Sequence, residues 1–252
     1  MRSPRIVAGI IGGAVGLLVV AALVLLVLVP RIPVAEPVDG DDETHPTWAP
    51  PAAPPLAAVD AAPGIQGQVD ADWATQTAAA TGIPLRALVA YAGAAMSKAA
   101  EMPECGISWS TLAGVGEIES DHGRHGGSSL DAGGTAVPPI FGIALDGGNT
   151  ANVPDSDGGE IDGDADHDRA VGPMQLIPQT WRNWHVDGGA DGVEDPQNID
   201  DAALAAANYL CRSSAAMDTE AGWRAAISAY NSSDTYLSNV AAAAVRYTQA
   251  AD

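Results

Sequence analysis

Two glutamates lie near the end of an apolar, helix-forming stretch, and their spacing predicts different roles for them. If residues 108–120 form a helix, each residue is rotated by about 100° from the last, so Glu119 lies roughly 40° from Val115 within an apolar stripe. Glu117 lies on about the opposite side and is predicted to be a solvated surface acid. A carboxyl group among apolar neighbours has a raised pKa, which suits a general acid near neutral pH. The alternative is that Glu119 caps a neighbour or pairs with a buried arginine.

A glutamine between apolar residues provides a second polar group. Gln175 lies in the run 170–178, three residues after Gly172 and just before a predicted helix. Glycine permits close approach of the backbone to a ligand, and an amide both donates and accepts hydrogen bonds, which suits a sugar hydroxyl or N-acetyl group. The alternative is a structural glutamine that bonds loop backbone.

Tyrosines near the C-terminal end offer surfaces for a sugar. Tyr230 and Asn231 end one predicted helix, and Tyr236 opens the next. A tyrosine combines a flat apolar face with a polar tip, as a sugar ring requires. The alternative is that Asn231 only caps its helix and that both tyrosines belong to the core.

The elements that would position these residues are almost all helical. Long runs of small residues favour close-packed helices, and strand signals are scarce apart from residues 137–143. The stretch 126–169 is rich in Gly and Asp and is predicted to be a long irregular insertion with a functional or ligand-ordered role. The spacing of apolar residues predicts helices over 70–81, 84–100, 108–120, 178–184, 200–213, 219–230 and 235–249.

The N-terminal segments predict where the domain resides. Residues 6–29 carry no charge and are long enough to span a bilayer, and the arginines of residues 1–5 place that end in the cytoplasm. The proline-rich residues 30–67 are predicted to be an extended linker to a folded domain at 68–252. A signal peptide cleaved near Val34–Ala35 is the alternative. Both interpretations place the domain outside the cytoplasm.

Charge excludes some partners. The net charge is −21, from 11 basic and 32 acidic residues. This argues against binding to nucleic acid, and against binding to anionic lipid through a basic face. Four of the five histidines follow the linker segment, lack the spacing of metal ligands and are expected at the surface; they are His122, His125, His167 and His185.

Four short motifs occur in an order that resembles a known enzyme family. They are Glu119-Ser120 followed by Gly123-Arg124, then Gly172-Pro173-Met174-Gln175, then Ala207-Asn208-Tyr209, and then Tyr230-Asn231-Ser232 with Tyr236. Over residues 105–250 this order resembles the membrane-bound lytic murein transglycosylases of the B type, whose catalytic domain is lysozyme-like. The resemblance implies that Glu119 is the sole catalytic acid/base. It also implies that the glycan-binding cleft contains Gln175, Tyr209, Tyr230, Asn231 and Tyr236.

The chain departs from that family in two segments. Residues 126–169 replace the family's usual intervening segment, so substrate contacts from that part cannot be carried over. The anchor is a hydrophobic helix rather than a lipoprotein cysteine, and this pattern is more similar to a Gram-positive branch of the family.

The resemblance implies cleavage of peptidoglycan glycan strands without a required cofactor. Glu119 would protonate the oxygen between N-acetylmuramic acid and N-acetylglucosamine, and its carboxylate would then accept the proton of the muramyl 6-hydroxyl to close a 1,6-anhydro ring. The first alternative is a hydrolytic muramidase that uses Asp121 or Asp168 as a second carboxylate. The other is a non-catalytic module that binds the cell wall.

Two acidic segments are candidate calcium sites. The first is a run of seven acids, Asp155, Asp157, Glu160, Asp162, Asp164, Asp166 and Asp168, for which the alternative is a solvated loop. The second resembles the EF-hand-like loop of some transglycosylases, with Asp187, Asp191 and the later Asp201 as ligands. Gly189 lacks the side-chain oxygen usual at the third position of such a loop.

The chain has two cysteines, Cys105 and Cys211. Outside the cytoplasm they are expected to form a disulfide that ties the Glu119 helix to the Tyr209 helix. Two free buried thiols are the alternative.

Overall fold

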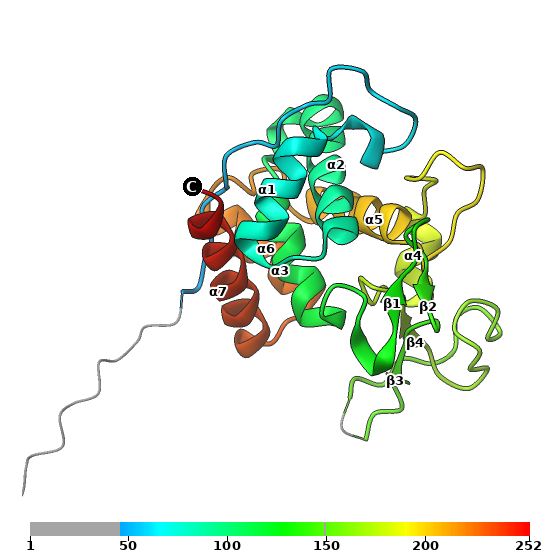
Figure 1. Cartoon of the computed structure of the whole chain (residues 1–252). Helices are drawn as coiled ribbons and strands as arrows, with labels where there is room; N and C mark the ends of the chain where they lie inside the picture. Colours follow the sequence, from blue (N-terminus) through cyan, green and yellow to red (C-terminus); the bar gives the residue numbers. More distant parts are fainter. Residues whose placement is uncertain (1–45, 149) are drawn as a thin grey trace, which may run out of the picture. The chain divides into compact units, whose positions relative to one another are not determined.

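The computed structural model describes residues 46–148 and 150–252, and these are mostly helical (Figure 1). Each predicted helix is present, with ends within two residues of the prediction, which confirms the mostly α class. The helices are α1 (Ala71–Thr81), α2 (Leu85–Glu101), α3 (Trp109–Ser120), α4 (Pro178–Trp184), α5 (Ile199–Ser213), α6 (Glu220–Tyr230) and α7 (Asp234–Ala251).

Polar caps set the start of most of these helices. A side-chain oxygen before the first turn accepts a backbone N–H that has no partner within the helix, which stabilises that end. Such caps precede α1, α3, α5, α6 and α7 and are provided by Asp70, Ser108, Asn198, Thr219 and Ser233. The sequence therefore fixes helix boundaries locally, through short polar residues before each apolar run.

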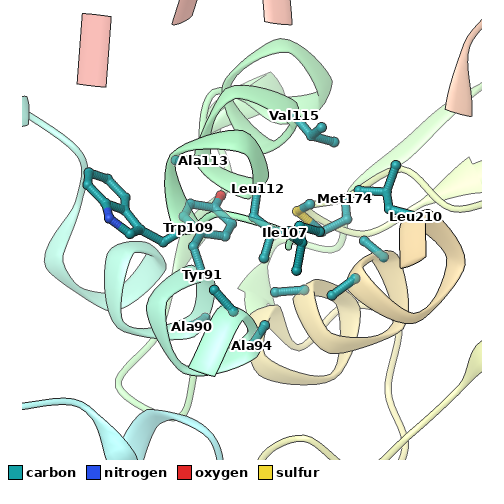
Figure 2. Close-up of a cluster of buried hydrophobic side chains, with 14 of the residues drawn as sticks. Ala90, Tyr91, Ala94, Ile107, Trp109, Leu112, Ala113, Val115, Met174 and Leu210 are labelled. Carbon is teal, nitrogen blue, oxygen red and sulfur yellow. The ribbon is translucent and has the colours of Figure 1, made fainter. Parts of the chain in front are cut away.

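Helix α3 lies in the middle of the apolar core (Figure 2). Leu112 and Val115 are fully buried, and the helix packs against α2, α5 and α7. A Cβ atom at Gly114 would lie only 2.8 Å from the carbonyl oxygen of Val240 on α7, so a glycine is needed for this close approach. The apolar stripe predicted from spacing is thus part of a helix that is buried on every side from Trp109 to Gly116.

The predicted disulfide is present. Cys105 and Cys211 are bonded, with their Cα atoms 5.3 Å apart. Cys105 closes the 3-10 turn Pro103–Cys105 before α3, and Cys211 lies in the last turn of α5. The cross-link therefore joins the base of α3 to α5, as the positions of the two cysteines indicated.

The insertion consists of two small antiparallel ribbons and an irregular loop. Strand β1 (Ser129–Leu130) pairs with β2 (Ala136–Val137), and β3 (Phe141–Ala144) pairs with β4 (Arg169–Val171). The candidate strand at 137–143 is interrupted, because Pro138 and Pro139 separate β2 from β3. The long loop between β3 and β4 has no further strand among its described residues, as expected for an irregular insertion.

Part of the predicted linker packs against the domain instead of extending from it. We call residues 46–69 the strap. Ala49 and Ile65 are buried in the core, and the indole N–H of Trp109 donates to the carbonyl oxygen of Ala53 at 3.1 Å. A Cβ atom at Gly93 on α2 would lie 2.2 Å from the carbonyl oxygen of Ile65. Because these residues of the strap pack in the core, the folded unit begins before residue 68. The few buried apolar residues are difficult to recognise in the sequence because prolines surround them.

The remaining N-terminal predictions lie outside the described residues. They are the cytoplasmic segment 1–5, the anchor 6–29 and the linker residues 30–45. Within residues 46–148 and 150–252, no single helix has the length and apolar character needed to cross a membrane, although α1 and α2 would pass together as a pair bent by 118°.

We predict that the strap stabilises the domain. Deleting residues 46–69 from the chain 46–252 should lower the free energy of unfolding by at least about 3 kcal/mol, since it removes the buried side chains of Ile65 and Val69. Urea unfolding followed by circular dichroism measures this change. Ile65→Ala should reproduce part of the loss, whereas Val59→Ala should be neutral because Val59 is 95% exposed. Equal urea midpoints for the two chain lengths would contradict the prediction.

Candidate active site

Glu119 lies in the last turn of α3, where the helix leaves the core. Its Oε1 atom accepts a hydrogen bond of 2.5 Å from the hydroxyl of Tyr236 on α7. Burial raises the pKa of Glu119 to about 7, and the hydrogen bond from Tyr236 opposes part of this rise. Burial also raises the pKa of Tyr236 well above its usual value, so that phenol remains a donor. Glu119 has no arginine partner among the described residues, and the interpretation as a buried ion pair is therefore not supported.

The end of α3 is fixed to the loop that carries Gln175. The hydroxyl of Ser120 donates to the carbonyl oxygen of Pro173 at 2.6 Å, and the hydroxyl of Tyr230 donates to that of Met174 at 2.6 Å. Gly172 has φ 72°, and a Cβ atom there would lie 1.7 Å from the carbonyl oxygen of Pro196. This glycine therefore serves a close approach between two backbone segments, a role that the sequence did not indicate.

Gln175 has both of the roles considered for it. Its Nε2 atom donates to the carbonyl oxygen of Gly172 at 3.0 Å, so it does bond loop backbone. It also lines the cleft that contains Glu119. Its φ of 48° is uncommon for a residue with a side chain, and the loop bonds around it hold that conformation.

Three tyrosines form a row beside Glu119. The rings of Tyr230 and Tyr236 are nearly parallel, at 4°, with centroids 6.5 Å apart, and the ring of Tyr209 lies 5.7 Å from that of Tyr230. The hydroxyl of Tyr209 donates to the carbonyl oxygen of Ala229. Asn231 caps α6, and its Oδ1 accepts from the backbone N–H of Ser233 at 3.0 Å. The predicted aromatic residues are thus brought together, and the capping role of Asn231 is also present.

An open cleft of about 640 Å³ runs past Glu119. A second recess of about 170 Å³ shares Gln175, Ile177, Ala229 and Tyr230 with it and adds Tyr209. Tyr236 lies behind Glu119 and does not line either cavity. The walls of the cleft are formed by Glu119, Leu145, Thr150, Ala151, Val153, Ala170, Gln175, Ile177, Ser228, Ala229, Tyr230, Asn231 and Ser232.

Sequence reasoning missed the residues that the insertion contributes to this cleft. Leu145, Thr150, Ala151 and Val153 form part of its wall, although they have neither periodicity nor a motif. The only signal was the unusual length of the insertion between two motifs.

Glu119 is the only carboxylate among the described residues of the cleft wall. The two acids considered as a second carboxylate lie elsewhere. Asp121 is exposed and pairs with Arg124 at 2.5 Å. Asp168 is fully buried, and its two oxygens accept from the backbone N–H and the hydroxyl of Ser156, each at 2.8 Å. The cleft therefore presents one titratable acid and several neutral polar groups.

Residues 96–249 match the family model of the transglycosylase SLT domain. The chain belongs to this family. SLT domains are lysozyme-like and act as lytic transglycosylases on peptidoglycan, so the enzyme class, the substrate and the fold predicted from the motifs are confirmed at the family level. No curated protein and no solved structure matches the chain significantly. The B type and the Gram-positive branch stay predictions.

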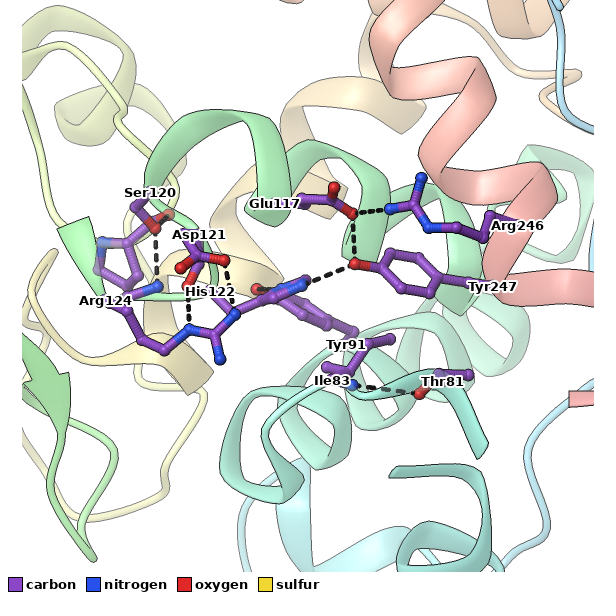
Figure 3. Close-up of polar contacts among 12 residues, drawn as sticks. Thr81, Ile83, Tyr91, Glu117, Ser120, Asp121, His122, Arg124, Arg246 and Tyr247 are labelled. Carbon is purple, nitrogen blue, oxygen red and sulfur yellow. Dashed lines mark hydrogen bonds and ion pairs between the residues drawn. The ribbon is translucent and has the colours of Figure 1, made fainter. Parts of the chain in front are cut away.

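Two predictions on the far side of α3 are wrong. Glu117 is not a free surface acid, because Arg246 and Tyr247 of α7 both donate to its Oε2 atom. His122 is only 2% exposed and lies between Tyr91 and Tyr247, with its ring nitrogens in hydrogen-bonding contact with both hydroxyls (Figure 3). Helix α7 packs closely on α3, so Glu117 is half-buried and His122 is buried.

Of the two candidate calcium sites, only the acidic run at 155–168 has three carboxylates close together. In the described part of the SLT chain, ligand oxygens of Asp155, Asp157 and Asp168 lie within 4.8 Å of one another, and no such group includes Asp187 or Asp201. The carboxylate of Asp201 is buried, which raises its pKa to about 6, even though it accepts several backbone N–H bonds.

We predict that Glu119 lowers stability at neutral and higher pH. Its pKa is raised from 4.5 to about 7, so the unfolded chain loses this proton first, and folding stability falls as the pH rises between these values. Glu119→Gln should therefore increase the free energy of unfolding at pH 8, by at most about 3 kcal/mol, and by little below pH 4.5. Urea unfolding at both pH values tests this, with Glu220→Gln on α6 as an exposed control. A gain that is equal at both pH values would contradict the prediction.

Proposed function

We propose that this SLT domain is a peptidoglycan lytic transglycosylase that cleaves the β-1,4 bond between N-acetylmuramic acid and N-acetylglucosamine, with Glu119 as acid and then as base. The observation that carries the proposal is that Glu119 is the only carboxylate among the described residues of the cleft wall. Its raised pKa keeps it protonated up to about neutral pH, as the first step requires.

The reaction needs one proton donor that later becomes an acceptor. Glu119 gives its proton to the glycosidic oxygen as the C1–O bond breaks, and the substrate's own N-acetyl oxygen stabilises the positive centre. The Glu119 carboxylate then takes the proton of the 6-hydroxyl, whose oxygen bonds to C1 and closes the 1,6-anhydro ring. The hydroxyl of Tyr236 already donates to Glu119, and this hydrogen bond strengthens when the carboxylate becomes charged. No water is consumed.

A hydrolytic muramidase is less well supported. Hydrolysis needs a second carboxylate about 5 to 9.5 Å from the first. Asp121 and Asp168, the two candidates, are engaged with Arg124 and Ser156 and do not line the cleft. A module that only binds the cell wall has no need for a buried, unpaired acid with a pKa near 7.

The remaining groups in the cleft suit a glycan. Gln175 donates to the loop backbone from Nε2, and its side-chain oxygen can accept from a sugar hydroxyl. Tyr209, Tyr230 and Asn231 supply ring faces and an amide along the same walls, and Tyr236 holds Glu119 from behind. The order of these motifs supports the B type within the family, and the predicted anchor supports its Gram-positive branch.

We assign the enzyme to the outer side of the cytoplasmic membrane, held by a single span at 6–29. The uncharged run and the arginines before it support this assignment, and the disulfide fits an oxidising compartment. Secretion after cleavage of the same segment is the second possibility. In either case the partner is the glycan strand of the cell wall.

The loop at 187–201 is proposed to bind a structural Ca²⁺ ion. Asp187 and Asp191 stand at the first and fifth positions, and Gly192 at the sixth has φ 87°, as the turn of an EF-hand loop requires. The two oxygens of Asp187 accept from the backbone N–H groups of Asp191 and Gly192. The ligand oxygens of Asp187, Asp191 and Asp201 do not all lie within 4.8 Å of one another, whereas those of Asp155, Asp157 and Asp168 do, so this second cluster is the competing location.

We predict the products of the reaction. The chain 46–252 should release glycan fragments with 1,6-anhydromuramic ends, which mass spectrometry distinguishes from reducing ends because the latter are one water heavier. Glu119→Gln should lower kcat at least a thousandfold, a loss in the range of general acid–base catalysis. Asp121→Asn is the matched control and should keep normal turnover. Reducing-end products alone would exclude transglycosylation, and undiminished turnover by Glu119→Gln would exclude this residue as the acid.

We predict that calcium stabilises the folded chain. Adding Ca²⁺ after removal of metal should raise Tm, because an ion that binds only the folded state shifts the unfolding equilibrium. Asp187→Asn should abolish the rise if the ion lies in the loop at 187–201, whereas Asp157→Asn should abolish it if the ion lies in the earlier cluster. A Tm that neither excess chelator nor Ca²⁺ changes would rule out both sites.

A further inference from the structure

The backbone that leaves α3 is strained directly beside Glu119. Asp121, His122 and Gly123 have φ values of 52°, 58° and 82°, three consecutive residues in the left-handed region. Only glycine adopts this region freely, so two of the three residues are in a disfavoured conformation. Such strain persists where the surrounding structure enforces it, and it is concentrated at functional sites.

The side chain of His122 is the anchor. Its Nδ1 atom lies 3.2 Å from the hydroxyl of Tyr91 on α2, and its Nε2 atom lies 2.9 Å from the hydroxyl of Tyr247 on α7 (Figure 3). Tyr91 reaches this position because α3 has Gly116 there, where a Cβ atom would lie 2.0 Å from the phenol oxygen. The imidazole is thus clamped between two helices that are far apart in the sequence.

The hydrogen bonds through this anchor run in one direction. The hydroxyl of Tyr247 donates its only proton to Glu117, so its oxygen accepts from Nε2–H of His122. In a neutral imidazole the other nitrogen is then an acceptor, and it takes the proton of the Tyr91 hydroxyl. Burial lowers the pKa of His122 to about 4, which keeps the ring neutral. The charged or titratable groups around it are Tyr91, Tyr247, Glu117, Asp121, Arg124 and Arg246.

The anchored turn is connected to the catalytic side of α3. The backbone N–H of Gly123 donates to the Ser120 hydroxyl at 2.8 Å, and that hydroxyl donates to the carbonyl oxygen of Pro173. We propose that His122 is a positioning residue, which locks the left-handed exit of α3 so that Ser120 holds the Pro173 loop and Glu119 faces the cleft. This inference rests on the proposed role of Glu119 as acid and base.

The test compares variants of the chain 46–252 in the glycan-cleavage assay. His122→Gly removes the anchor but tolerates the left-handed backbone. It should lower kcat about a hundredfold, as expected for a misplaced catalytic group, with KM changed less than about threefold. The alkaline limb of its pH–rate profile should move below pH 7, because a displaced Glu119 is better solvated and its pKa falls.

Two further variants separate positioning from stability. His122→Asn fits a left-handed conformation and keeps an acceptor near Tyr91, so it should recover at least about tenfold of the lost kcat and return the alkaline limb toward pH 7. Asp121→Gly is the matched control. It relieves strain at the neighbouring, exposed position without removing the anchor, and it should retain the normal kcat and pH profile.

A folded His122→Gly enzyme with normal kcat, or with lower kcat and an unmoved alkaline limb, would overturn the proposal. If His122→Gly does not fold, Tyr91→Phe replaces it. That variant deletes only the hydroxyl that donates to Nδ1 and should shift kcat and the limb in the same direction, and unchanged values would again overturn the proposal. Glu119→Gln is measured alongside. Normal turnover by Glu119→Gln defeats the proposed function, whereas its inactivity beside a normal His122→Gly defeats only the positioning role.

Discussion

The close packing of α3 against its neighbours is the constraint on which the site depends. Gly114 and Gly116 have no side chains to separate α3 from α7 and from Tyr91, so the helix is enclosed up to Gly116 and reaches solvent only in its last turn. Glu119 lies where that enclosure ends. It is buried enough for its pKa to rise to about 7, yet it borders the open cleft. Larger residues at the two glycines would move α3 outward and solvate the acid, because a packed core has no spare volume.

Helix α7 gives the two glutamates of α3 different chemistry. On one face, Arg246 and Tyr247 donate to Glu117, which suits a charged carboxylate with a structural role. On the other face, Tyr236 donates a single neutral hydrogen bond to Glu119, and no cation among the described residues pairs with it. Glu117 and Glu119 lie in the same turn of α3 and both contact α7, yet Glu117 is held in a structural ion pair and Glu119 is an acid with a raised pKa. Environment, rather than residue type, separates them.

Features that depend on neighbouring residues in the chain could be predicted from the sequence. Short polar caps and apolar spacing located the helices, and rotation about the α3 axis was enough to distinguish Glu119 from Glu117. Local rules do not reveal partners that are distant in the chain. The burial of His122 depends on Tyr91, 31 residues earlier, and on Tyr247, 125 residues later. The need for Gly172 comes from the backbone of Pro196, and the strap is held by a few apolar residues among many prolines. Each of these features has a tertiary cause, which local sequence patterns do not contain.

The acidic insertion at 126–169 forms and supports one wall of the cleft. Asp168, which the sequence offered as a second catalytic carboxylate, uses both side-chain oxygens to hold Ser156. The backbone N–H of Asp168 donates to the carbonyl oxygen of Val153, and its carbonyl oxygen accepts from the backbone N–H of Leu145. The backbone N–H of Val153 in turn donates to the carbonyl oxygen of Leu145, and both of these residues line the cleft. Neighbouring aspartates likewise accept backbone N–H groups of their own loop. These carboxylates replace the regular hydrogen bonding that a loop lacks, so the wall facing Glu119 is built without a helix or a long strand. A stretch rich in acids thereby contributes shape to the cleft, and Glu119 is left as the only carboxylate among the described residues of its wall.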